Sequence, residues 1–174
     1  MDLSILPECY VDTNLIETLV PPIIRGYNHQ MGCGTVGKKM QVNFSDSFAL
    51  GIIDKDKKQL DYLKEFTEVK KSGPLTLHRH KSKHHYIIQI SPAIEQFILD
   101  AVASIGLSME DFGLPAEINA LTKVTKTEQS KNAVKFKDLF KAIKKAGNAD
   151  FLRLAQWVKY LRDNPYDARI EDLE

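Results

Sequence analysis

The chain has 174 residues, of which 43% are hydrophobic and 27% are charged, and its formal net charge is +1. This composition is typical of a globular domain with its own core and excludes a disordered or fibrous chain. Because the net charge is close to zero, affinity for nucleic acid must come from basic residues concentrated in one region.

No apolar run reaches the roughly 18 residues needed to span a membrane. The N-terminal residues lack the basic segment of a signal peptide, so we expect no membrane association and a cytoplasmic location. Cys9 and Cys33 have no metal-type spacing. They are interpreted as reduced thiols.

The first predicted strand lies within residues 5–16 and ends at or near Asp12. Thr13 or Asn14 then caps a helix that runs to Val20, where two prolines stop or bend it. On these boundaries Asp12 stands at the carboxyl end of a strand, where ligands gather in open α/β sheets.

A glycine-rich stretch follows, in which Gly32, Gly34 and Gly37 fit the dinucleotide-binding pattern G-x-G-x-x-G. The residues before Gly32 are too polar for the buried strand that this pattern requires, and Lys39 takes the place of the Ser or Thr of a P-loop. Two interpretations stay open. The stretch is a turn between elements, or its amides approach an anion that Lys38 or Lys39 also contacts.

Residues 47–54 form an unbroken apolar run that ends on Asp54 and Asp56. Such a run predicts a strand buried on both faces of a parallel sheet. If this strand lies beside the first one, Asp12, Asp54 and Asp56 converge on one cleft, and their mutual repulsion favours Mg²⁺ or Mn²⁺ between them. The alternative is a charged turn that solvates the end of a strand.

Residues 57–69 carry apolar side chains at helical spacing and predict a surface helix. Residues 75–77 and 85–90 are predicted to be extended, and residues 78–84 between them form a basic loop. Four of the five histidines fall in residues 78–85, but the interleaved cations would repel zinc. Arg79 and Lys81 suit contacts to phosphate, whereas a plain solvated hairpin loop is the alternative.

Ser91 and Pro92 open the next predicted helix, which buries a full apolar stripe. Further helices are predicted over residues 127–146 and 149–163, and the first of these is rich in lysine. The expected organisation is an α/β domain over residues 1–106, a helical hairpin packed on it over residues 107–166, and an acidic tail over residues 167–174.

Three features together resemble the Toprim domain of topoisomerases, primases and OLD-type nucleases. They are a strand ending in Tyr10-Val11-Asp12, the glycine loop from Gly32 to Gly37, and a buried strand ending in Asp54-Lys55-Asp56. The resemblance covers about residues 5–105. It implies a small, mainly parallel sheet flanked by helices, Mg²⁺ held by the acids, and phosphodiester chemistry on DNA or RNA.

The Toprim family carries a glutamate, followed by glycine, at the end of its first strand and assigns it a general acid/base role. On the predicted boundaries Asp12 takes that place, because Glu8 comes too early and Glu17 too late. The stretch from Val11 to Leu15 is also similar to the opening motif of PIN-domain ribonucleases, whose sites likewise gather carboxylates around metal.

The sequence therefore predicts a Toprim-like α/β protein that cleaves nucleic acid. Asp12, Asp54 and Asp56 would hold Mg²⁺ or Mn²⁺ and form the catalytic site. Contacts to phosphate are expected from four basic residues: Lys38, Lys39, Arg79 and Lys81. One alternative is a non-catalytic module that binds nucleic acid or a partner protein. A weaker one is a nucleotide-binding protein that uses the loop from Gly32 to Lys39.

Overall fold

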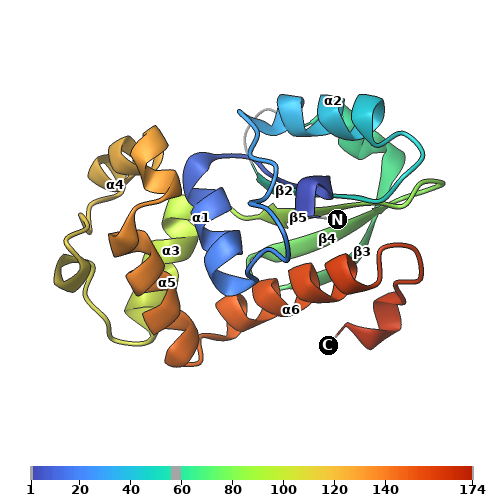
Figure 1. The fold of residues 1–174 in the computed structure, drawn as a ribbon. Coiled ribbons are helices and arrows are strands. Elements are labelled where there is room, and N and C mark those ends of the chain that lie inside the picture. Colours follow the sequence, from blue (N-terminus) through green and yellow to red (C-terminus); the bar gives the residue numbers. More distant parts are fainter. Residues whose placement is uncertain (1, 56–59, 174) are drawn as a thin grey trace.

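A computed structural model describes residues 2–55 and 60–173. Its centre is a five-stranded sheet between two helical layers (Figure 1). The strands are β1 (Ile5–Pro7), β2 (Ala49–Asp54), β3 (Phe66–Ser72), β4 (Leu75–His80) and β5 (His85–Ile90). The α-helices are α1 (Tyr10–Leu19), α2 (Cys33–Asn43), α3 (Ile94–Ser104), α4 (Ile118–Thr125), α5 (Val134–Lys145) and α6 (Ala149–Asp163).

The sheet is mixed, with strand order β1-β2-β5-β4-β3. Parallel pairing joins β1 to β2 and β2 to β5, whereas β5 to β4 and β4 to β3 are antiparallel. The prediction of a mainly parallel sheet is therefore wrong, although the α/β class is confirmed. The reason is local: only two residues separate β3 from β4 and four separate β4 from β5. Such short connections join antiparallel neighbours.

Strand β2 confirms the prediction of a strand buried on both faces. Its first five residues are all buried. Gly51 lies in the middle of β2, where an added Cβ would come within 2.9 Å of Cγ1 of Val36 on α2. Glycine at this position lets α2 pack directly on the strand.

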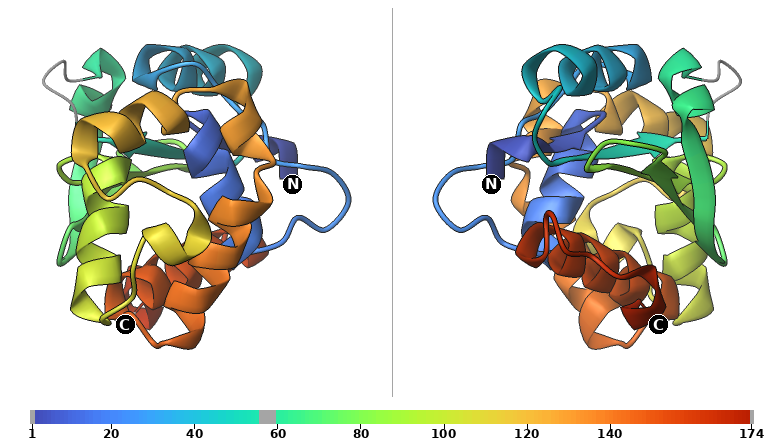
Figure 2. Two further views of the ribbon diagram at one scale, coloured as in Figure 1. Left: turned by 90° about the vertical axis from the view of Figure 1, so that its left-hand side faces the viewer. Right: turned by 90° about the vertical axis from the view of Figure 1, so that its right-hand side faces the viewer.

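The sheet separates two apolar clusters. The larger one packs α1, α3, α5 and α6 against one face, and the smaller one packs α2 and the 3₁₀-helix Asp61–Glu65 against the other (Figure 2). Helices from both halves of the chain share the larger cluster; for example, the rings of Phe97 on α3 and Phe151 on α6 stack with centroids 5.0 Å apart. Within the described residues, no helix has the length and apolarity needed to cross a membrane.

Two predicted elements are wrong. The first strand ends at Pro7, and α1 already begins at Tyr10, so Asp12 lies in the first turn of a helix and not at a strand end. Where a helix over residues 57–69 was expected, the described part is a 3₁₀ turn followed by β3. The predicted strands at 75–77 and 85–90 are confirmed.

Candidate acidic site

The carboxyl ends of β1 and β2 meet at one edge of the sheet and bring two carboxylates together. Glu8 follows β1 directly, and its amide donates a hydrogen bond of 3.0 Å to the carbonyl of Ile52. Asp54 is the last residue of β2, and its amide donates to Oε2 of Glu8 at 2.9 Å. The parallel pairing of the two strands therefore fixes Glu8 beside Asp54.

Asp12 is buried just behind these two residues, in the first turn of α1. Its Oδ2 accepts a hydrogen bond of 3.1 Å from the amide of Cys9, and its own amide donates to the Cys9 sulfur at 3.5 Å. This reciprocal pair is a capping box that starts the helix. Only 1% of Asp12 is exposed.

A fourth carboxylate, Glu95, comes from the first turn of α3. Its Oε1 accepts a short hydrogen bond from the hydroxyl of Thr125 at the end of α4. Asp54 is tied to the same helix start, because its Oδ1 accepts a hydrogen bond of 2.9 Å from the amide of Ile94. Glu8, Asp54 and Glu95 line a cavity of about 400 Å³ whose other walls are the start of α3 and the end of α4.

The carboxylates repel one another in a poorly hydrated site. Burial raises the pKa of Asp12, and the charges of Glu8 and Glu95 raise it further. Burial also raises the pKa of Asp54 well above its usual range, with the charges of Asp12, Glu8 and Glu95 adding to the shift. The pKa of the Cys9 thiol is raised by burial and by the charge of Asp12, so this thiol is not an activated nucleophile.

Oδ1 of Asp12 is buried and has no hydrogen-bond partner among the described residues. Two other buried side-chain atoms share this property in that part of the chain, Nε2 of His29 and Nε1 of Trp157, and neither belongs to an acid. A buried carboxylate oxygen without a donor carries a free-energy cost that a cation would relieve.

The donor set fits Mg²⁺ or Mn²⁺, because carboxylate oxygens are the ligands that these cations prefer. Across residues 2–55 and 60–173, no three His, Cys, Asp or Glu side chains form a ready-made metal group. The carboxylates of Glu8 and Asp54 instead accept hydrogen bonds from backbone amides. Binding therefore requires these side chains to rotate or to reach the cation through water, which Mg²⁺ retains readily.

The structure brings together some of the predicted site residues and separates others. Asp12 and Asp54 share the acidic site, whereas Asp56 lies outside the described residues. Arg79 pairs with Tyr86 near the beginning of β5, so Arg79 and the following Lys81 lie at the opposite end of the strands from Asp54. A strand of six residues spans about 20 Å, and this length separates the two basic residues from the acidic site.

Lys38 and Lys39 lie on α2, on the other side of the sheet from α1 and α3. Gly32 is the N-cap of this helix, and the glycines after it fall inside the helix. An added Cβ on Gly37 would come within 2.7 Å of Leu60, so this glycine serves packing. No strand of the described chain leads into Gly32, which argues against both nucleotide-binding patterns.

Two residues of the site, Glu8 and Glu95, were missing from the predicted set. Glu8 was judged too early because the first strand was extended to Asp12. The spacing of Cys9 and Asp12, which form the capping box, marks the start of α1. Cysteine is not among the favoured N-cap residues, so this start is hard to predict. Glu95 lies in the first turn of a helix, where a negative charge is favourable in itself, so its position alone gives no sign of a site.

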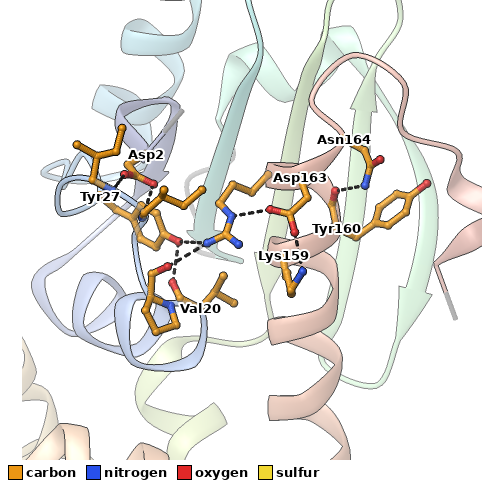
Figure 3. A network of polar contacts seen from close by, with 11 residues as sticks. Asp2, Val20, Tyr27, Lys159, Tyr160, Asp163 and Asn164 are labelled. Carbon is orange, nitrogen blue, oxygen red and sulfur yellow. Dashed lines mark hydrogen bonds and ion pairs between the residues drawn. The ribbon is translucent and has the colours of Figure 1, made fainter.

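A second buried polar network lies away from the acidic site and is well satisfied (Figure 3). The carboxylate of Asp2 accepts hydrogen bonds from the amides of residues 23–25. On the neighbouring side, Arg162 of α6 donates to the carbonyl of Pro21 at 3.0 Å, and the hydroxyl of Tyr27 donates to the carbonyl of Val20 at 2.7 Å. These bonds hold the loop that follows α1.

Comparisons of the chain with protein-family models, with curated proteins and with solved structures found no match. The class of the molecule is therefore defined by its own architecture. It is an α/β protein with a mixed five-stranded sheet and an acidic pocket at the carboxyl ends of β1 and β2.

Proposed function

We propose that this protein hydrolyses phosphodiester bonds of nucleic acid with the help of Mg²⁺ or Mn²⁺ at the acidic site. One observation carries the proposal: four carboxylates from four segments of the chain converge at the carboxyl ends of β1 and β2, and a buried oxygen of Asp12 has no hydrogen-bond donor among the described residues. Carboxylates that gather in this way, with raised pKa values at Asp12 and Asp54, are typical of a functional site.

The corrected strand boundary supports the Toprim-like interpretation. Glu8 now stands directly after β1, which is where that family carries its general acid/base glutamate. Cys9 follows it in place of the family's glycine, and the aspartate of β2 keeps the expected position.

In this proposal Glu8, Asp12 and Asp54 would hold the cation. Mg²⁺, when bound there, would lower the pKa of a coordinated water and offset charge on the phosphate. Glu95, oriented by the hydroxyl of Thr125, would accept the proton of the water molecule that attacks phosphorus. The P–O bond to the leaving strand would break as the new P–O bond forms, and the leaving oxygen would take a proton from solvent. Asp54 keeps its place through the amide of Ile94, so the start of α3 fixes the distance between the pocket wall and the carboxylates.

A second candidate is a non-catalytic module that binds nucleic acid or a partner protein. It is favoured by the finding that no ready-made metal group exists within the described residues. Its binding surface would be the exposed lysines of α5, including Lys135, Lys141 and Lys145.

Titration with Mg²⁺ and Mn²⁺ while the melting temperature is measured separates the two candidates. At a cation concentration ten times Kd, a site in the folded state adds about 1.4 kcal/mol to the free energy of unfolding. For a chain of this size that corresponds to a rise of roughly 4 °C. Asp54→Asn should abolish the rise and the matched exposed variant Asp111→Asn should keep it. A metal-independent melting temperature would favour the non-catalytic module.

A further inference from the structure

We infer that the acidic pocket accepts one nucleotide unit of a single strand or of a single-stranded overhang, and that it excludes paired duplex. This inference rests on the proposed function and specifies its substrate. The cavity of about 400 Å³ is near the lower end of the range for small-molecule sites, and it suits a phosphate with its attached sugar.

Glu8, Asp54 and Glu95 line a concave site that has two helical walls. One wall is the start of α3, and the other consists of Thr122, Thr125 and Lys126 at the end of α4. The hydrogen bond between Thr125 and Glu95 ties the two walls together. A flexible single strand can place one phosphodiester group between these walls. In a duplex, base stacking and pairing keep the sugar-phosphate backbone stiff, so a single phosphodiester cannot enter on its own.

Two lysines stand at the pocket. Lys55 follows β2 and Lys126 follows α4, and both are exposed. Their ammonium groups supply contacts to phosphate beside a cluster of negative charge, where an anionic strand would otherwise be repelled.

The described lining residues include no aromatic side chain on which a base could stack. Stacking contributes about 1–3 kcal/mol per base in proteins that bind single strands. Without it, the pocket holds the backbone, so we expect binding that depends little on base sequence.

The test measures binding in Ca²⁺, which permits occupancy of an oxygen-ligand site without consuming the strand. A labelled 12-nucleotide single strand is compared with the same sequence as a blunt duplex and as a duplex with a single-stranded overhang. We expect the single strand and the overhang to bind at least about tenfold more tightly than the blunt duplex. Equal binding of the blunt duplex, or binding of none of the three, would overturn the inference.

Lys126→Ala should weaken binding of the single strand by about tenfold, since a charge-assisted contact to phosphate is lost. Lys123→Ala is the matched control, because Lys123 is exposed on the same helix and does not line the pocket. Equal losses in both variants would show a diffuse charge effect and contradict the assigned contact.

A cleavage assay in Mn²⁺ on the same three substrates distinguishes this inference from the proposed function. Preference for the single strand in binding without cleavage of any substrate leaves the pocket assignment standing and removes the proposed hydrolysis. Cleavage of blunt duplex at the rate of single strand keeps the hydrolysis and overturns the pocket assignment.

Discussion

Asp2 and Asp12 are two buried aspartates whose surroundings differ in the number of hydrogen-bond donors. Their exposures are 5% and 1%. Burial raises the pKa of Asp2, but hydrogen bonds from the amides of residues 23–25 together outweigh it, and the pKa is lowered. Asp12 receives the amide of Cys9 on one oxygen and no partner on the other within the described chain, and its pKa is raised by burial and by neighbouring charges.

The difference shows that burial alone does not decide the direction in which the pKa of an aspartate shifts. At Asp2 the donors are supplied by a loop, so the carboxylate works as a structural anchor. At Asp12 the neighbours are other acids, so burial and repulsion both disfavour its ionised form in the folded chain. The two aspartates should therefore respond in opposite directions to mutation.

The largest effect is expected for Asp2→Ala. The substitution leaves backbone donors of the loop without their acceptor, so the free energy of unfolding should fall by about 3 kcal/mol. Urea unfolding followed by circular dichroism measures this change. Asp111→Ala, at an exposed aspartate, is the control and should stay within about 0.5 kcal/mol. A loss at Asp2 as small as the control's would mean that the anchor is not structural.

Asp12→Asn should instead stabilise the protein at neutral pH, by about 2 kcal/mol. Asparagine keeps a carbonyl oxygen for the amide of Cys9 and removes the ionisable group. The folded protein then no longer has to protonate, or bury the charge of, an acid that is ionised when unfolded.

The pH dependence of this effect has a definite sign. Because the folded pKa of Asp12 is raised, the folded state binds more protons than the unfolded state, and wild-type stability falls as pH rises above the unfolded pKa of about 3.9. The advantage of Asp12→Asn should therefore be absent at pH 3.5 and grow towards pH 7. An advantage that is constant with pH would contradict the raised pKa.

Sequence patterns predicted the parts of the fold that local burial determines. The run ending at Asp54 and the strand before Ser91 are apolar enough to fix β2 and β5, and both are found. The edge strand β3 was missed. Its side chains are partly exposed and mixed in character, so its state depends on hydrogen bonds to β4 that no local pattern reveals.

The part of the candidate site that lies at the end of a buried strand was predictable from the sequence. Asp54 follows from the apolar run that precedes it. The role of Glu8 depends on where β1 ends. That end was not predictable because α1 begins with a cysteine N-cap, which is not among the preferred N-cap residues. Arg79 lies away from the acidic site for a different reason. The two connections of β4 are short, so β4 pairs antiparallel with its neighbours, and this pairing places Arg79 at the opposite end of the strands from Asp54.

The smallest effect is expected for Thr125→Val. This variant tests whether the hydrogen bond to Glu95 only stabilises the fold, as the bonds to Asp2 do, or also serves the acidic site that contains Asp12. The hydroxyl of Thr125 donates to Glu95 in a buried position, so its loss should cost about 1 kcal/mol of stability. Thr127→Val removes an exposed hydroxyl that bonds only within its own turn, and it should stay within about 0.5 kcal/mol.

The cation response of Thr125→Val gives a second readout that a purely structural bond would not change. If Thr125 orients Glu95 for work at the acidic site, the variant should keep its stabilisation by Mn²⁺, because Glu8, Asp12 and Asp54 remain, but lose cleavage of single strands by about tenfold. If cleavage stays at the wild-type rate while stability falls, the bond between α3 and α4 is structural like the anchor at Asp2, and the proton acceptor has to be sought at Glu8.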